Sequence, residues 1–328
     1  MKHSLLDVLR CPACRLPLAL ENAKETDGEI ETGSLRCAKC NEVYPVAGFI
    51  PRFVPADNYA NNFGFQWNQF RQTQLDTHSG VPISRKRFLA QTNWNEQTLT
   101  GKRVLDAGCG AGRFAQIALS LGAEVFAIDY SSAVDAAWKN LAPHPRLHLI
   151  QADIYRLPFA PATFDFVYSL GVLQHTPDVK AAFMALPPLA KPGGGITVDL
   201  YLKSWRNVIQ PRYYLRWLTT RMPQPRLFSI IQRTAPALLK VSRAVSRIPL
   251  AGKVLRRAVP VANYTGILPL TEQQLLEWAI LDTFDWFAPA YDQPQTPATL
   301  RRWMDEAGLR DVHVEHIQHL TGRGVRAG

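Results

Sequence analysis

Three glycines at alternate positions follow an acidic residue and a short apolar run in this chain. Asp106 precedes Gly108, Gly110 and Gly112 within the run VLDAGCGAGRF. Glycines at such a turn let the backbone approach a flat or extended ligand closely and adopt positive φ angles. A dinucleotide site would carry its third glycine one position later, where this chain has Arg113. The spacing therefore favours a nucleotide-like ligand without a pyrophosphate.

Further acids stand at the ends of two more predicted strands. The run AEVFAIDY ends in Asp129 and Tyr130, about 20 residues after the turn, where related folds hold a ribose diol. The run LHLIQADI ends in Asp153 and Ile154. Carboxylates suit a ligand that offers hydroxyl, amine and cationic groups. Each acid alone could be a cap, an exposed strand end or a turn former, but their joint spacing favours one site.

Five segments in this order resemble the class I S-adenosylmethionine-dependent methyltransferases. They include FDFVYSL, and KPGGG before ITVDL, and together they cover residues 101–202. The resemblance implies an α/β Rossmann-like sheet, mostly parallel with an antiparallel last strand, and S-adenosylmethionine as cofactor. It implies that Asp106 organises the glycine loop and that Asp153 meets the adenine amine. The cofactor-binding residues implied are Asp106, Gly108, Gly110, Gly112, Asp129, Tyr130, Asp153, Ile154 and Ser169.

Four cysteines near the start of the chain form two Cys-x-x-Cys pairs, Cys11 with Cys14 and Cys37 with Cys40. Four thiolates at this spacing suit a closed tetrahedral zinc site, and two disulfides are the alternative. No sustained apolar run precedes them, so we expect a reducing cytosol, which favours the metal. Because all four positions are filled, the predicted zinc is structural.

The same window resembles the small zinc-ribbon proteins that activate RNA and protein methyltransferases. It is also similar to the zinc ribbon of a bacterial ribosomal-RNA guanine methyltransferase, although the ligands differ there. A module of this size is expected to need its metal to fold. We predict a ribbon at 1–55, a helical lead-in at 56–100, the methyltransferase domain at 101–202 and 286–328, and a helical cap inserted at 203–285.

The cap carries most of the charge imbalance. Between Leu200 and Thr271 the chain has thirteen basic residues and no acid, against a formal net charge of +10 for the whole protein. Apolar residues recur there at helical spacing, which predicts amphipathic helices broken at prolines such as Pro223, Pro236 and Pro249. Such a surface fits anionic lipid, a nucleic-acid backbone, an anionic small molecule, or a merely solvated face.

The candidate acceptor residues lie around this framework. His175 follows the fourth predicted strand and could remove a proton, although packing or capping is an equal alternative. Trp67 is a candidate lid contact, and Tyr291 and Asp292 are candidate acceptor contacts, with ordinary packing as the alternative. The Asn/Asp-Pro-Pro-Tyr/Phe signature of amino-methylating enzymes is absent after that strand, which favours oxygen or carbon acceptors.

Together these features predict methyl transfer by in-line displacement to an oxygen, less probably a carbon or nitrogen, of an anionic or lipid-linked small acceptor. RNA methylation is the alternative, and a non-catalytic scaffold is a second one. No apolar run reaches the roughly 18 residues that a membrane-spanning helix needs. We expect a cytoplasmic protein that could contact a membrane surface through its cap.

Overall fold

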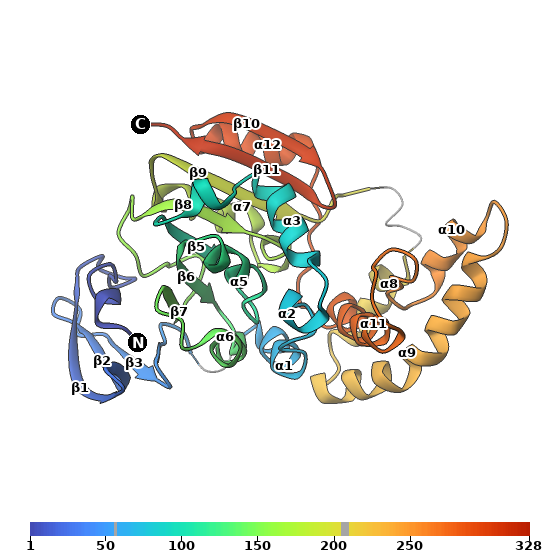
Figure 1. Cartoon of the computed structure of the whole chain (residues 1–328), viewed down its shortest axis with the longest axis horizontal. Coiled ribbons are helices and arrows are strands. Elements are labelled where there is room, and N and C mark those ends of the chain that lie inside the picture. Colours follow the sequence, from blue (N-terminus) through green and yellow to red (C-terminus); the bar gives the residue numbers. More distant parts are fainter. Residues whose placement is uncertain (56–57, 205–209) are drawn as a thin grey trace.

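The computed structural model describes residues 1–55, 58–204 and 210–328. A small N-terminal sheet, a larger central sheet and a helical cap follow one another across the molecule (Figure 1). The ribbon and the cap lie at opposite ends, with the central sheet between them. The predicted start of the lead-in at residue 56, and Trp205 and Arg206 of the cap, lie outside the described residues.

The central sheet has the predicted α/β topology. Its strand order is β10-β11-β9-β8-β5-β6-β7 in the described residues. Strands β5 to β9 run parallel, and β11 is antiparallel to both of its neighbours, which confirms the predicted antiparallel last strand. The strands are β5 (Arg103–Ala107), β6 (Glu124–Asp129), β7 (Leu147–Gln151), β8 (Phe164–Ser169), β9 (Ala190–Leu200), β10 (Leu309–His316) and β11 (Leu320–Arg326).

Alternating strand residues build two separate cores, one on each face of the sheet. Val104 packs with helices α3 (Ile83–Thr92), α5 (Arg113–Ser120) and α6 (Ala133–Leu141). Its neighbour Leu105 packs on the other face, with α7 (Val179–Met184), η3 (Pro187–Leu189) and α12 (Pro297–Glu306). Both faces of the parallel strands are therefore buried, which explains their nearly continuous apolar sequences.

The glycine run KPGGG, which the sequence placed before the fifth strand, is part of that strand. Strand β9 begins at Ala190 and includes Gly193, which has φ +77° at an irregularity in the pairing with β8. A Cβ at Gly195 would lie 2.7 Å from the Phe166 ring. The glycines therefore accommodate a bulge and a close aromatic neighbour.

The lead-in forms the helices α1 (Asn61–Gln69), α2 (Asp76–Ser79), α3 and α4 (Glu96–Leu99). Of these, α1, α2 and α3 lie on the side of the sheet toward the cap (Figure 1). In α3, Arg87 and Gln91 donate to the buried carboxylate of Asp199 on β9 at 2.6 and 2.7 Å. Burial alone would raise the pKa of Asp199, but the Arg87 guanidinium and the other donors hold that pKa below its ordinary value. This pair anchors the lead-in to the sheet.

The N-terminal sheet is an antiparallel ribbon of β1 (Leu18–Thr26), β2 (Glu29–Cys37), β3 (Val43–Ala47) and β4 (Ile50–Pro51), preceded by η1 (His3–Leu5). It covers the outer edge of the central sheet, because Arg52 pairs with Gln151 at the end of β7. Leu5 and Leu9 belong to the same buried core as the strand residues of the central sheet. The two modules therefore share one core.

The cap consists of α8 (Pro211–Thr219), α9 (Gln224–Ser246), α10 (Gly252–Leu255), η5 (Arg256–Ala258) and α11 (Glu272–Phe287). The break expected at Pro236 is wrong, because α9 continues through this residue. Its buried side chains Leu227, Ile231 and Leu239 share a core with α11, and this packing outweighs the proline penalty. The predicted return to the sheet at residue 286 falls inside α11. No helix in the described ranges is long and apolar enough to span a membrane.

Candidate cofactor and acceptor site

The glycine loop lies at the carboxyl end of β5, the position at which open α/β sheets bind ligands. Gly108, Gly110 and Gly112 have φ angles of +93°, +53° and +88°. The backbone N–H groups of Gly108 and Cys109 both donate to the carbonyl of Ile128 on β6, each at 2.8 Å. The positive φ angles explain why glycine is required at these positions.

Asp129 ends β6 beside this loop. Its Oδ2 accepts the Gly110 N–H at 3.0 Å, and its Oδ1 accepts the backbone N–H and the hydroxyl of Ser131 at 2.8 and 2.7 Å. Burial raises the pKa of Asp129, although these donors oppose the shift. A carboxylate has about four lone-pair sites, so Asp129 retains acceptor capacity toward a ligand.

Asp106 lies beneath the loop and is 2% exposed. Its Oδ2 and the hydroxyl of Tyr168 on β8 are both buried and lie near each other, and no well-formed hydrogen bond satisfies either atom. Burial raises the pKa of Asp106 to about 7, and the nearby Asp129 carboxylate adds to the shift. A buried acceptor without a partner is costly, so a cationic or hydrogen-donating ligand group would be stabilised here.

Aromatic rings border the end of β7. Tyr59, just before α1, stacks on Tyr130 with ring centroids 4.9 Å apart and meets Tyr291 edge-on at 5.8 Å. Burial raises the pKa of Tyr59, and the nearby groups that raise it further include Tyr155 and Asp153. Asp153 itself accepts the Tyr155 N–H at 2.9 Å, so it forms the turn considered as its alternative role. The structure thus brings Tyr130, Asp153 and Tyr291 to one place.

Helix α1 covers this edge of the sheet. A Cβ on Gly110 would come within 3.1 Å of Trp67 Nε1, so Trp67 lies directly against the loop. One turn earlier, a Cβ on Gly64 would lie 2.4 Å from the Ser132 hydroxyl. The Phe63 ring lies 5.2 Å from the His175 ring. Trp67 therefore contacts the glycine loop, and its role as a lid contact stays a prediction.

His175 is buried in η2 (Leu173–His175), directly after β8. Its Nδ1 lies 3.0 Å from the carbonyl of Tyr291, which can only accept. In the neutral ring Nδ1 therefore carries the proton and Nε2 carries the lone pair. Tyr201 lies edge-on at 5.4 Å, and Asp292, next to Tyr291, has a buried Oδ1 without a partner. The predicted base and the two predicted acceptor contacts are therefore neighbours.

Two predicted cofactor contacts have other roles in the structure. The hydroxyl of Ser169, at the end of β8, is fully buried and donates to the carbonyl of Ala107 at 2.7 Å. Ile154 is buried in the core below the sheet edge. A ligand could therefore use the Ser169 oxygen only as an acceptor, and Ile154 would contribute a wall.

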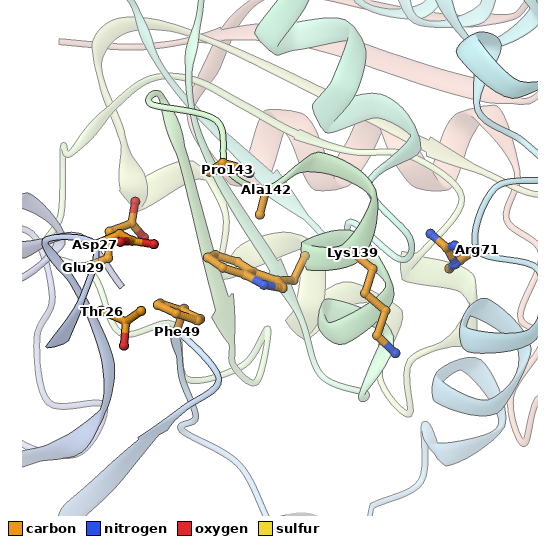
Figure 2. Close-up of a pocket in the computed structure, with 9 residues that line it drawn as sticks. Thr26, Asp27, Glu29, Phe49, Arg71, Lys139, Ala142 and Pro143 are labelled. Atoms are coloured by element: carbon orange, nitrogen blue, oxygen red, sulfur yellow. The ribbon is translucent and has the colours of Figure 1, made fainter. Parts of the chain in front are cut away.

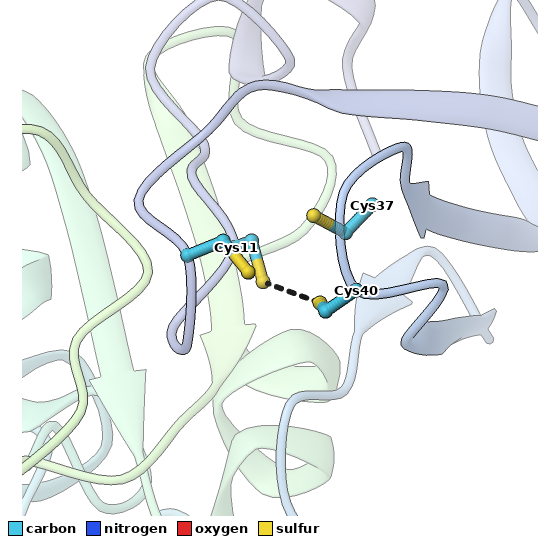
Figure 3. A group of neighbouring side chains, drawn as sticks. Cys11, Cys37 and Cys40 are labelled. Atoms are coloured by element: carbon cyan, nitrogen blue, oxygen red, sulfur yellow. Dashed lines mark hydrogen bonds between the residues drawn. The ribbon is translucent and has the colours of Figure 1, made fainter.

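The four N-terminal cysteines converge as expected for a metal centre (Figure 3). Their sulfurs lie within 4.8 Å of one another. Cys11 Sγ and Cys40 Sγ are 3.7 Å apart. Two thiolates bound to one zinc at about 2.3 Å in a tetrahedron would be separated by about 3.8 Å. The cluster therefore fits a structural zinc site in which every ligand position is a thiolate.

Two family profiles match the chain. One is described as a methyltransferase domain and matches residues 105–198. The other is described as Trm112p-like protein and matches residues 2–47. The first covers the glycine loop and the strand ends that carry Asp129, Asp153 and His175, and the second covers the four cysteines.

Curated relatives complete this comparison. The ubiquinone biosynthesis O-methyltransferase of Idiomarina loihiensis is 32% identical over 186 residues, which cover 51% of this chain and 74% of that protein. The chain belongs to the S-adenosylmethionine-dependent methyltransferases. The enzyme of the same name from Rhodopseudomonas palustris is 33% identical over 125 residues, 37% of this methyltransferase and 49% of its relative. The methyltransferase thus spans about half the length of several such relatives.

Solved structures give weaker likenesses. A complex of the Haloferax volcanii Trm112 methyltransferase activator and a putative methyltransferase shows 13% identity, with 81% of this chain and 98% of that chain covered and a TM-score of 0.45. Human N-acetylserotonin methyltransferase with S-adenosylmethionine shows 15% identity, 84% and 61% coverage and a TM-score of 0.47. With TM-scores below 0.5, nothing further follows from them.

The residues of this methyltransferase fit its cofactor. Besides Asp106, the amide groups of Gln66 on α1 and Gln174 on η2 are buried without hydrogen-bond partners, as is Nδ2 of Asn62. These donors and acceptors suit a zwitterionic ligand with hydroxyl groups. Neither these three amide side chains nor Tyr59 was predicted as a site residue from the sequence. Their only sequence signal is an amide-rich and aromatic composition around α1.

A cleft of about 770 Å³ lies elsewhere. It separates the ribbon hairpin from α6, and Phe49 stacks on Trp138 there at 4.9 Å (Figure 2). Its lining also includes the acidic Asp27 and Glu29 on the ribbon side and Lys139 on the side of α6. None of the predicted site residues lines this cleft, so it belongs to the seam between the two modules.

Proposed function

We propose that this methyltransferase transfers a methyl group to a hydroxyl of a small acceptor bound between the sheet edge and the cap. One observation carries the proposal: His175 lies beside Tyr291 and Asp292, next to the covered glycine loop. S-adenosylmethionine supplies an activated methyl group, so the protein mainly has to align the acceptor and take up a proton.

Within the proposal, each loop residue holds one part of the cofactor. Asp129 accepts the ribose hydroxyls with its remaining lone pairs, and Asp153 accepts the adenine amine. The Asp106 carboxylate and the amides of Gln66 and Gln174, which are buried without hydrogen-bond partners, would hold the amino-acid end. Trp67 and Tyr59 exclude water from above. Burial in this water-poor site strengthens each of these polar contacts.

The acceptor step is a single displacement. The acceptor oxygen forms a bond to the methyl carbon while the carbon–sulfur bond breaks. The electron pair of the broken bond stays on the sulfur, which becomes a neutral thioether. Nε2 of His175 takes the hydroxyl proton, and the Tyr291 carbonyl, which accepts from Nδ1, stabilises the resulting imidazolium. An oxygen acceptor is supported by the missing amino-methylating signature and by the names of the curated relatives.

The surface of the cap supports an anionic or lipid-linked acceptor. Eleven of the fourteen exposed large apolar side chains in the described ranges belong to the cap. Tyr214, Leu215, Trp217 and Leu218 share one face of α8, and Trp217 is 72% exposed. The surrounding sequence holds only basic charges. An apolar face bordered by cations is complementary to an anionic bilayer. Each basic residue near the membrane surface contributes about 1 kcal/mol to the free energy of binding.

We expect the protein to float with vesicles that contain phosphatidylglycerol and not with vesicles of phosphatidylcholine alone. Replacing Trp217 and Leu218 by serine should abolish flotation, because the apolar contact is lost. Serine at Leu16 and Val43, two exposed apolar residues of the ribbon, is the control and should change nothing. Failure to float, together with salt-sensitive binding of RNA, would instead support the RNA alternative.

Asp129→Ala should weaken the binding of S-adenosylhomocysteine by about 10- to 100-fold, because a hydrogen bond to a charged group contributes about 1.5–3 kcal/mol. Calorimetry on the zinc-loaded protein measures this directly. Ser131→Ala is the control, because it removes one donor to Asp129 and keeps the carboxylate. Equal losses in the two variants would mean that Asp129 only shapes the loop. Unchanged binding in Asp129→Ala would remove this residue from the site.

A further inference from the structure

A cavity of about 200 Å³ lies inside the cap. It is bounded by the start of α8, by α9 and by the chain that follows α10, and its lining includes Arg212, Arg256 and Arg257. Ser242, Asn263 and Trp286 add hydrogen-bonding groups and an aromatic wall. Its volume suits a small ionic group with its nearest carbons.

Positive charge dominates this cavity. Arg212 Nε is buried without a hydrogen-bond partner, whereas its Nη2 donates to the Tyr213 hydroxyl at 3.0 Å. A buried donor of a charged group is costly to leave unpaired. Arg256 and Arg257 form no ion pair in the described ranges. The chain between residues 200 and 271 offers no acid that could neutralise these groups.

The carboxylates near the cavity come from other elements, and two of them are engaged. Asp282 accepts the hydroxyl of Tyr264, and Asp285 accepts the hydroxyl of Tyr201 at 3.1 Å. Burial lowers the pKa of Arg216, and the negative charge of Asp292 opposes this shift only in part. The lining itself contains three guanidiniums, Arg212, Arg256 and Arg257, and no carboxylate, so a surplus of positive charge remains in the cavity.

The cavity and the acceptor site share an aromatic neighbour. The Arg212 guanidinium lies 5.6 Å from the centre of the Tyr201 ring and 5.5 Å from that of Trp286. The Tyr201 ring also lies 5.4 Å from the His175 ring. The candidate base and the candidate anion contact are therefore both neighbours of Tyr201.

We propose that Arg212, Arg256 and Arg257 form a subsite for a phosphate group of the acceptor, which places the acceptor hydroxyl at His175. The inference rests on the proposed function and names its substrate class, a hydroxyl compound that carries a phosphate. Guanidiniums bind phosphate in a bidentate manner, and several converging forks match its multiple charged oxygens better than a single carboxylate. The same chemistry serves a soluble phosphate ester and a phosphate lipid headgroup.

The test is calorimetric titration of the full-length, zinc-loaded protein with inorganic pyrophosphate. Binding should weaken at least about tenfold in an Arg256→Gln/Arg257→Gln variant, which removes two charge-assisted contacts. The matched control is Arg233→Gln/Arg247→Gln, which removes the same charge from the cap outside the cavity. Absent binding, equal losses in both variants, or succinate binding as tightly as pyrophosphate would each overturn the subsite.

Two further measurements separate the subsite from the proposed function. Binding of S-adenosylhomocysteine should be unchanged in the Arg256→Gln/Arg257→Gln variant, since its residues lie at the sheet edge. If pyrophosphate binds as expected while no hydroxyl compound is methylated, the subsite stands and the proposed function fails. The affinities for glycerol phosphate and for a short-chain phosphatidic acid identify the source of the phosphate. Tighter binding of glycerol phosphate indicates a soluble phosphate ester, and tighter binding of phosphatidic acid indicates a lipid headgroup.

Discussion

His175→Ala is expected to lower kcat for methyl transfer by about 100- to 10,000-fold, the usual contribution of a positioned general base. The expected acceptor probes are a dihydroxybenzoate and a phosphorylated hydroxyl compound, with methyl transfer followed from labelled S-adenosylmethionine. KM should change little, because the ring contacts Phe63 and Tyr201 rather than providing a binding charge. His313→Ala, an exposed histidine on β10, is the matched control.

A nitro-substituted catechol distinguishes a base from a structural histidine. Its hydroxyl ionises more readily, so it depends less on proton removal by the protein. We therefore expect the His175→Ala variant to lose clearly less methyl-transfer activity with the nitrocatechol than with catechol itself. A uniform loss with both acceptors would show that His175 only holds Tyr291 and the end of the cap in place.

Part of the site could be predicted because its chemistry dictates residue types at short, fixed spacings. The glycine turn needs positive φ at three alternate residues, and the structure has them at Gly108, Gly110 and Gly112. The zinc centre needs two thiolate pairs, and Cys11 and Cys40 meet at the required distance. Both signals lie within the primary sequence, so no knowledge of packing was necessary.

The covering of the site could not be predicted, because it joins residues that are far apart in the chain. Tyr59 contacts Tyr130 and Tyr291 through rings brought together only by the finished fold. Likewise, nothing near Arg212 in the sequence indicates that the rings of Tyr201 and Trp286 both lie close to its guanidinium. The aromatic composition of a segment does not indicate which distant residue each ring contacts.

Local rules failed where packing outweighed them. Pro236 removes one backbone hydrogen bond from α9, but the apolar face of that helix is held by α11, so the helix continues. The Ser169 hydroxyl, which the family resemblance implied at the ligand, donates to the carbonyl of Ala107 on the neighbouring strand, so only its oxygen could still accept from a ligand. A buried backbone acceptor takes precedence because leaving it unpaired is costly.

Removal of zinc is expected to destabilise the methyltransferase domain as well as the ribbon. Cys37→Ser should lower the melting temperature by about 10 °C or more, because structural zinc contributes several kcal/mol and each kcal/mol corresponds to about 2–4 °C at this size. Lys39→Ser, in the same knuckle but without a ligand atom, is the matched control. Differential scanning calorimetry of both variants gives the comparison.

The seam between the modules is the physical reason for this wider effect. The backbone N–H of Arg10 donates to the Pro158 carbonyl and that of Phe53 to the Gln151 carbonyl, each at 2.8 Å. The Lys2 ammonium reaches the Leu147 carbonyl at 3.1 Å. If the ribbon unfolds, β7 becomes an uncovered edge strand whose backbone groups lose these partners.

Hydrogen exchange localises the predicted damage. In Cys37→Ser, the amides of 147–151 should lose protection together with those of the ribbon, whereas strands β8 and β9 in the centre of the sheet should stay protected. Because Asp153 follows β7 directly, S-adenosylhomocysteine binding should weaken in the same variant. A ribbon that unfolds while β7 keeps its protection would show that the shared core does not couple the two modules, and the zinc would then support the ribbon alone.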